Sequence, residues 1–170
     1  MPAVNGWALY FHSAFKDKFE ALPAEVQRLK ELLEPDPYLS HPKVKLLERL
    51  RAIVLEEIPR DPGAATYEQG NTLGTSYRHW KRAKFLGRFR LFFRFSSKHK
   101  IIVYAWVNDE NTLRKAGAKT DPYVIFEKRV RSGEPPDHWD DLVACSSAAL
   151  HDDPALREPP NRGGEGTEER

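Results

Sequence analysis

The residues best suited to chemistry lie between positions 81 and 95, in the stretch KRAKFLGRFRLFFRF. Six basic side chains alternate there with five phenylalanines, and no acidic residue interrupts them. All the Asp, Glu, Lys and Arg residues between Glu68 and Asp109 are basic. Cations on one surface repel one another unless an anion lies among them. The stretch therefore favours a surface that holds a phosphate chain; the alternative is a solvated sheet face on which arginine serves solubility.

Alternation within this stretch separates its two faces. Strand geometry places Phe89, Leu91, Phe93 and Phe95 on one face and Arg88, Arg90, Phe92 and Arg94 on the other. Arg82 and Lys84 join the basic face if residues 81–85 pair with this strand. Phe92, on the basic face, is either half-covered core or a platform on which a base stacks.

A second constellation, NDENTLR at 108–114, follows an apolar strand and continues with Lys115, Lys119 and Tyr123. Its plain interpretation is a capped turn formed by Asn108 and Asp109, surface cations, and a core tyrosine. Its functional interpretation is a second set of groups around the same phosphate.

One reaction suits a basic site that lacks metal-ligand motifs, since the histidines are scattered and no glycine-rich phosphate loop occurs. In that reaction a ribose 2′-hydroxyl attacks its own phosphodiester. The protein must position the chain, stabilise the extra negative charge and move two protons. Arginine binds phosphate oxygens through two N–H groups, and a lysine crowded by cations serves as a base. We expect neither a metal nor a cofactor.

The predicted elements that position these residues begin with a strand at 7–12. Apolar spacing over 15–33 predicts a helix that Pro23 kinks or splits, and a second helix over 44–58 ends at Pro59. A long loop, 59–79, then leads to strands at 81–85, 88–95 and 101–107. A last helix begins after Asp121 and ends at Gly133.

This order predicts an α+β domain, with a small antiparallel sheet, an N-terminal helical pair and a C-terminal helix. At 170 residues we expect one domain over 1–144, followed by a disordered, polar tail over 145–170. The single cysteine fits a reducing compartment, and we find neither a signal peptide nor a membrane span. We therefore expect a cytoplasmic protein.

The motifs of four stretches resemble the YhaV family of type II toxin–antitoxin toxins, within the RelE/ParE superfamily. They are VNGWALYFH (4–12), KRAKFLGRFRLFFRF (81–95), AWVNDENTLRKAGAKTDPYVIF (105–126) and GEPPDHWDDL (133–142). The resemblance implies a RelE-like fold and an endoribonuclease that cuts mRNA, commonly on the ribosome, and so inhibits translation and growth. It also implies a PrlF-type antitoxin with an AbrB-like fold, and operator DNA binding only as the toxin–antitoxin complex.

The resemblance also assigns site residues. Four positions match the catalytic set around the scissile phosphate: Lys84, Arg90, Arg114 and Tyr123. The basic residues expected to bind RNA are Arg82, Arg88, Arg94 and Lys119. Asn108, Asp109 and Asp121 are expected to hold the cations in place. Arg82 departs from the family pattern, where lysine is common, so Lys84 is the better base; His79 is a candidate acid.

Two other functions compete with this interpretation. A non-catalytic module would use the basic face only to dock RNA or the ribosome and would block translation without cleavage. A gyrase poison of the ParE type would share the fold, but the presence of Lys84, Arg90 and Tyr123 disfavours it.

Overall fold

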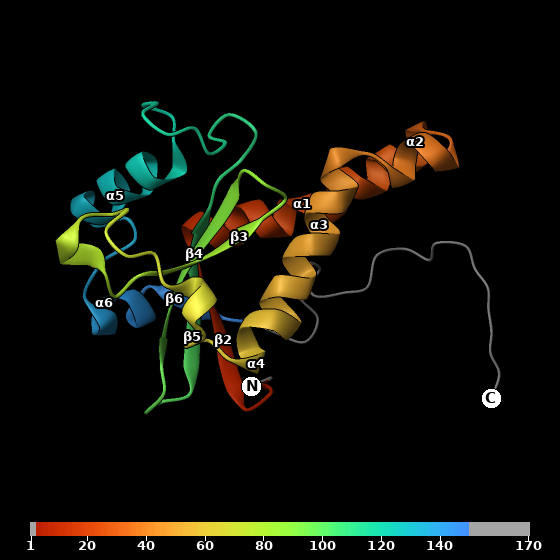
Figure 1. The fold of residues 1–170 in the computed structure, drawn as a ribbon. Helices are drawn as coiled ribbons and strands as arrows, with labels where there is room; N and C mark the ends of the chain where they lie inside the picture. The colour runs from red at the N-terminus through yellow and green to blue at the C-terminus, as the bar shows by residue number, and fades with distance from the viewer. Residues whose placement is uncertain (1–2, 150–170) are drawn as a thin grey trace.

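The computed structural model describes residues 3–149, which fold around one mixed sheet (Figure 1). The strands are ordered β1-β2-β5-β4-β3. β1 pairs with the first residues of β2, and β6 pairs with its last residues. Their bounds are β1 Ala3–Val4, β2 Trp7–His12, β3 Lys81–Phe85, β4 Phe89–Ser96, β5 Ile101–Val107 and β6 Ser146–Ala148. The β2–β5 pair is parallel, whereas the other pairs are antiparallel.

The helices lie on both sides of this sheet. One group comprises α1 Ser13–Leu32, α2 Pro35–Leu39 and α3 Pro42–Ala52, extended by a π-helical turn over Ile53–Glu57 and by α4 Ile58–Arg60. In Figure 1, the C-terminal part of α1, α2 and the start of α3 project from the sheet as a helical arm. The second group, α5 Pro122–Ser132 and α6 Trp139–Ala144, lies on the other side.

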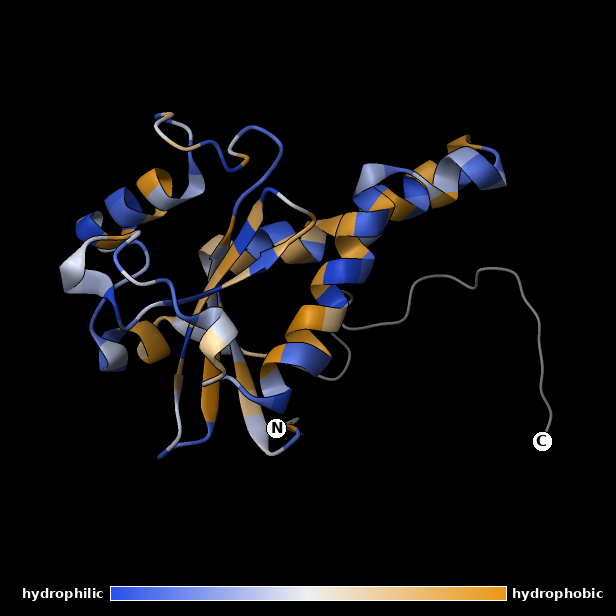
Figure 2. Ribbon diagram, in the orientation of Figure 1, coloured by the Kyte–Doolittle hydropathy of each residue, from blue (hydrophilic) through white to orange (hydrophobic). Residues whose placement is uncertain are grey.

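Each face of β4 contributes to a different core cluster. Leu91 and Phe93 pack with α1 and α3, while Phe92 packs with Trp106 and Phe126 beneath α5. The Phe92 and Phe126 rings stack with 4.2 Å between centroids. Figure 2 shows the matching alternation of hydrophobic and hydrophilic turns along α1 and α3. The core interpretation of Phe92 is thus confirmed, because α5 covers the sheet face that carries the arginines.

The α+β class and the strands predicted at 7–12, 81–85 and 101–107 are confirmed. Two features of the sheet differ from the prediction. The sheet is not wholly antiparallel, because β2 and β5 run side by side in the same direction. The domain also extends past the boundary predicted at 144, because residues 146–148 pair with β2. The remainder of the predicted tail, 150–170, lies outside the described residues.

The helical predictions need smaller corrections. Pro23 lies inside α1 and does not divide it, and Pro59 lies within the short helix α4 instead of ending the preceding one. Asp121 and Gly133 cap α5 as predicted, with Gly133 in the left-handed region at φ 90°. No helix of residues 3–149 has the length and apolar character of a membrane span.

The long loop between α4 and β3 is anchored rather than open. Leu73 and Trp80 are buried. The buried Gln69 side chain accepts from the Leu73 N–H at 3.2 Å and donates to the Tyr77 carbonyl at 2.7 Å. These contacts fix the path of a segment that could otherwise move freely, and they bring residues 65–67 against β3.

Candidate functional site

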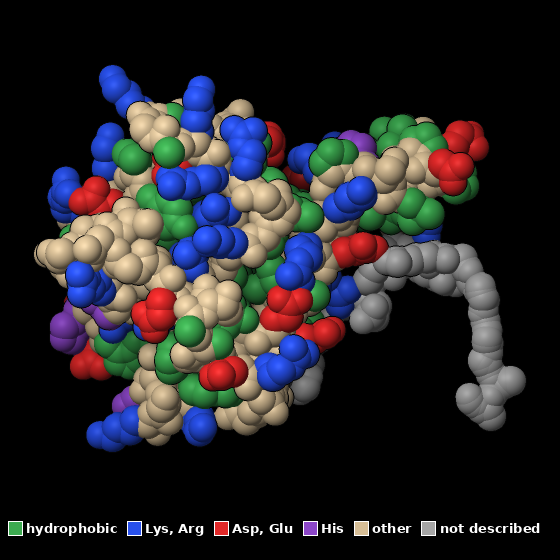
Figure 3. Space-filling model, in the orientation of Figure 1, with side chains coloured by type: hydrophobic (Ala, Val, Ile, Leu, Met, Phe, Trp, Pro, Cys, Tyr) green, Lys and Arg blue, Asp and Glu red, His purple; other side chains and the backbone are tan. Residues whose placement is uncertain are grey.

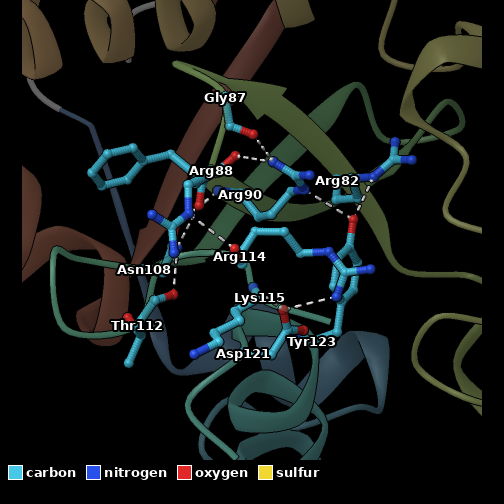
Figure 4. Close-up of polar contacts among 11 residues, drawn as sticks. Arg82, Gly87, Arg88, Arg90, Asn108, Thr112, Arg114, Lys115, Asp121 and Tyr123 are labelled. Carbon is cyan, nitrogen blue, oxygen red and sulfur yellow. Dashed lines mark hydrogen bonds and ion pairs between the residues drawn. The ribbon is translucent and has the colours of Figure 1, made fainter. Parts of the chain in front are cut away.

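Three arginines surround the side chain of Tyr123 (Figure 4). The Tyr123 hydroxyl oxygen accepts from Arg82 Nε at 2.9 Å and from Arg90 Nε at 3.1 Å. The guanidinium of Arg114 lies over the tyrosine ring, 4.8 Å from its centroid. Because both lone pairs of the hydroxyl oxygen accept from arginine, its proton must point elsewhere. We call Arg82, Arg90, Arg114 and Tyr123 the tyrosine cluster.

Strand register and one helix cap assemble this cluster. The antiparallel pairing of β3 with β4 sets Arg82 opposite Phe92 and Lys84 opposite Arg90, so all four side chains share one sheet face. Tyr123 lies in the first turn of α5, where its backbone N–H donates to the N-cap carboxylate of Asp121 at 3.1 Å. The cap therefore fixes where the tyrosine enters the site.

Asp121 is the main organiser of the loop that follows β5. Its carboxylate is almost fully buried and also accepts from the Arg114 side chain at 2.8 Å and from the Lys115 backbone N–H at 2.7 Å. Asp121 was predicted to hold a site cation, and it contacts Arg114 directly.

Asn108 ties the same loop to β4. Its side-chain oxygen accepts from the Arg90 backbone N–H at 2.8 Å, and its amide donates to the carbonyls of Arg88 and Thr112. Arg88 and Arg114 join the two segments again, since the Arg114 N–H donates to the Arg88 carbonyl and Arg88 Nε donates to the Arg114 carbonyl. Arg90 and Arg114 are thus held by one network.

The electrostatics of the cluster are unbalanced. Arg82 and Arg90 are only 8% and 7% exposed. Their hydrogen bonds go to neutral oxygens, namely Tyr123 and the carbonyls of Thr66, Gly87 and Phe89. Within residues 3–149 neither forms an ion pair with a carboxylate. Buried charges are normally paired, so two buried cations without a carboxylate partner among residues 3–149 are unusual.

The cluster retains unused donors that such an anion could contact. An arginine carries five N–H donors, and no described acceptor lies on the Nη2 groups of Arg82 or Arg90. Lys84, Arg88 and Lys119 are exposed. In Figure 3, Lys and Arg side chains gather over this upper part of the sheet body.

Arg94 lies outside the cluster, although it shares the sheet face. Its guanidinium packs between the rings of Trp80 and Trp139, 5.6 and 5.5 Å from their centroids, and donates to the Asp137 carbonyl. Burial lowers the pKa of Arg94 below its usual value. Asp137 also accepts from His79 at 2.6 Å and from Trp80 at 2.7 Å, so His79 belongs to this second group.

Asp109 serves its own turn rather than a cation of the cluster. Its carboxylate accepts from the Asn111 N–H and the Thr112 hydroxyl, and it lies 3.8 Å from Lys18 Nζ. Lys18 also donates to the Val107 carbonyl at 2.7 Å, and burial lowers the pKa of Lys18.

The sequence did not predict the contacts of Lys18, nor those of Thr66, whose carbonyl accepts from Arg82. The unusual length of the 59–79 loop was the only signal for Thr66.

No group of three or more His, Cys, Asp or Glu side chains within residues 3–149 could hold a metal ion. The site is built from cations, one phenol, neutral oxygens and the carboxylate of Asp121, which pairs with Arg114. Such a set binds and polarises an anion, and the phenol can move a proton.

Comparison with known proteins gives this site a context. Residues 9–147 match the family model of a toxin with endonuclease activity, of a toxin–antitoxin system. Two relatives from Escherichia coli strains are named Toxin YhaV and Ribonuclease toxin YhaV. Each is 44% identical over 142 residues, which cover 82% of this chain and 92% of the relative. No solved structure matches the chain. Because the family model spans most of the sequence, the chain belongs to the YhaV family of endonuclease toxins of toxin–antitoxin systems.

Proposed function

We propose that the tyrosine cluster cleaves mRNA without a metal, by attack of the ribose 2′-hydroxyl on the adjacent phosphate. The observation that carries this proposal is the pair of buried arginines, Arg82 and Arg90, which lack a carboxylate partner within the described chain. A phosphodiester supplies the missing negative charge. The Escherichia coli relative named Ribonuclease toxin YhaV supports RNA as the substrate.

The four residues divide the work as follows. Arg82 and Arg90 donate through their unused N–H groups to the non-bridging phosphate oxygens, where negative charge increases in the transition state. Arg114, held by Asp121, adds a third positive charge over the tyrosine ring. These charges need no rearrangement during the reaction, because the hydrogen bonds already fix them.

Two proton transfers complete the reaction. Lys84, opposite Arg90 in the strand register, accepts the proton of the attacking 2′-hydroxyl. The Tyr123 hydroxyl, whose oxygen accepts from two arginines, donates its proton toward the leaving 5′-oxygen. Base stacking on the Tyr123 ring is the less favoured role, because the residue is 5% exposed and its ring packs against Phe92 and Arg114.

The cellular consequence of this reaction is arrest of translation and growth. Arg88 and Lys119 bind phosphates of the RNA on either side of the cleaved bond. The target is mRNA on the ribosome, in the cytoplasm. A PrlF-type antitoxin with an AbrB-like fold neutralises the toxin, and the complex of the two represses its own operon by binding operator DNA. Membership of a toxin–antitoxin family supports the presence of such a partner.

The mechanism is tested with an RNA oligonucleotide that carries a single 2′-deoxynucleotide on the 5′ side of the cleaved bond. We expect cleavage at that bond to stop, because the nucleophile is missing. A deoxynucleotide placed two positions away should leave cleavage at the original bond unchanged. The products of the unmodified RNA should end in a 2′,3′-cyclic phosphate and a 5′-hydroxyl, with the same rate in EDTA. Cleavage that persists at the deoxy position would show that water or a protein group is the nucleophile.

A further inference from the structure

Arg94 lies in a group of aromatic side chains that the proposed cleavage mechanism does not use. Its guanidinium packs between the rings of Trp80 and Trp139, and its only hydrogen bond within residues 3–149 goes to the Asp137 carbonyl. The Asp137 carboxylate accepts from His79 and from the Trp80 indole through one oxygen, Oδ1. We call Arg94, Asp137, His79 and Trp139 the tryptophan patch.

The tryptophan patch continues the sheet face that carries the tyrosine cluster. Along β4, Arg94 follows Arg90 by four residues, which corresponds to about 13 Å at the rise of a strand. Trp80, against which Arg94 packs, precedes Arg82 by two residues, or about 7 Å. An RNA strand held at the tyrosine cluster therefore reaches the patch after a few nucleotides.

Several groups of the tryptophan patch are open to solvent. The side chains of His79 and Asp137 are each 39% exposed, and Trp139 is half-buried. Within the described part of the chain, no donor lies on Asp137 Oδ2 and no acceptor lies on the Trp139 indole N–H. Accessible aromatic rings beside a cation are the usual platform on which proteins stack the bases of single-stranded nucleic acids.

The charges of the tryptophan patch favour a base over a phosphate. Arg94 is accompanied by the carboxylate of Asp137, and Asp140 and Asp141 follow in the first turn of α6. These carboxylates repel a phosphate, whereas a base carries no charge. A carboxylate oxygen accepts from the amino group of a base, as Asp and Glu do from cytosine N4. Uracil has a carbonyl oxygen in that position, which a carboxylate repels.

We propose that the tryptophan patch binds one RNA base a few nucleotides from the cleaved bond. The base stacks on Trp139, and Asp137 Oδ2 selects a base with an amino group, so that cytosine is preferred over uracil. The selecting oxygen is held in place, because His79 and Trp80 both engage Oδ1. This inference rests on the proposed function, since it takes RNA as the substrate, and it adds a sequence preference to that function.

The test measures the affinity of the full chain for short 2′-O-methyl oligocytidine and oligouridine, which lack the attacking hydroxyl and so report binding alone. The wild type should bind oligocytidine more tightly. Asp137→Asn should reduce the ratio of the two affinities about fivefold. The Trp80 indole N–H still requires an acceptor at Oδ1, so the asparagine amide takes the place of Oδ2 and donates to the uracil carbonyl. Asp140→Asn is the matched control, because it removes the same charge from the exposed first turn of α6, and it should leave the ratio unchanged.

A second pair of variants tests the stacking. Trp139→Leu keeps an apolar side chain but no aromatic face, and it should weaken the binding of both oligonucleotides about fivefold or more. Trp139→Phe retains a ring and should stay within about twofold of the wild type. Equal losses in these two variants would contradict stacking on Trp139.

An unchanged ratio in Asp137→Asn would overturn the selection of the base. If Asp137→Asn weakened binding of the antitoxin encoded with this chain and left the ratio unchanged, the patch would belong to the antitoxin instead. No binding of either oligonucleotide by the wild type would contradict RNA as the ligand of the patch. Failure of the cleavage mechanism is distinguishable from all of these outcomes, because the deoxynucleotide experiment measures cleavage and this one measures binding.

Discussion

At the scale of residues, Lys84 has the role that a single substitution tests most directly. It lies opposite Arg90 in the register, and it forms no ion pair within residues 3–149. A base must release and accept a proton, whereas a charge-stabilising group need only stay positive. Arginine retains the charge but does not deprotonate in proteins. Lys84→Arg therefore separates the two roles at one position.

We expect Lys84→Arg to lower the single-turnover cleavage rate by about 10²–10⁴, as much as Lys84→Ala does, because proton transfer is lost in both. The measurement is the initial rate on one RNA oligonucleotide, with binding affinity determined in parallel. Lys98→Ala is the control, since it removes an exposed lysine from the turn that follows β4. It should leave both the cleavage rate and the RNA affinity unchanged. A Lys84→Arg protein that cleaves at near wild-type rate would reduce Lys84 to an electrostatic role.

The sequence brought together several residues of the tyrosine cluster, and their roles in cleavage stay a prediction. Alternation set Arg82, Lys84 and Arg90 on one face, and the resemblance added Arg114 and Tyr123, which the structure brings together with the arginines. Arg94 fits the same alternation but lies between Trp80 and Trp139. Alternation states which face a side chain occupies. It does not state which segments cover that face, and here α6 supplies Trp139 and the residue that precedes β3 is Trp80.

At the scale of elements, strand limits were predictable because they depend on local period and flanking turns. Strand partners were not, because the parallel β2–β5 pair joins segments almost a hundred residues apart. The strand β6 was missed for a different reason. Its three residues, SSA, show no apolar alternation, and only pairing with β2 makes them a strand. The domain boundary predicted at 144 fell short for the same reason.

The first helix carries a pH-dependent cap that follows from its own sequence. His12 is buried at the N-terminus of α1, and its Nδ1 accepts from the Ala14 N–H at 3.0 Å. Burial is the largest effect and lowers the pKa of His12 below 6.5, with Arg129 acting in the same direction and Glu134 and Asp17 opposing. The unfolded chain therefore binds a proton below pH 6.5 more readily than the folded chain does. Stability is complete above that pH and is lost as the pH falls.

We expect the free energy of unfolding of the wild type to fall on going from pH 7.5 to pH 5.5, and we expect this fall to be smaller in His12→Asn. Asparagine caps a helix but does not titrate, so the substitution separates the cap from the charge. Urea unfolding of both proteins at the two pH values measures it, and the other titrating groups cancel in the difference. Identical falls in the two proteins would show that His12 contributes nothing to the pH dependence.

At the scale of the whole molecule, the net charge of +2 hides a strong asymmetry. Lys and Arg side chains gather over the upper part of the sheet body (Figure 3), whereas the cavity between α1 and the loop after β5 is lined by more acids than cations. The acids are Asp17, Glu25, Asp109 and Glu110, and the cations are Lys18 and Lys43. The two ends of the sheet also differ, because the turn at 97–100 lies at the opposite end from the tyrosine cluster. RNA affinity should therefore depend on where a cation is removed and not only on the net charge.

The salt dependence of RNA binding measures this asymmetry. Each phosphate contact on a single strand contributes about −0.7 to the slope of log K against log salt. Removing the exposed cations of the 108–121 loop with Lys115→Ala and Lys119→Ala should make the slope shallower by about 1.4. The ligand is an RNA oligonucleotide with a 2′-deoxynucleotide at the cleavage position, so that binding is measured without turnover. Lys98→Ala removes a charge at the opposite end of the sheet and should leave the slope unchanged. Equal slopes for the double variant and the wild type would mean that RNA does not cross this loop.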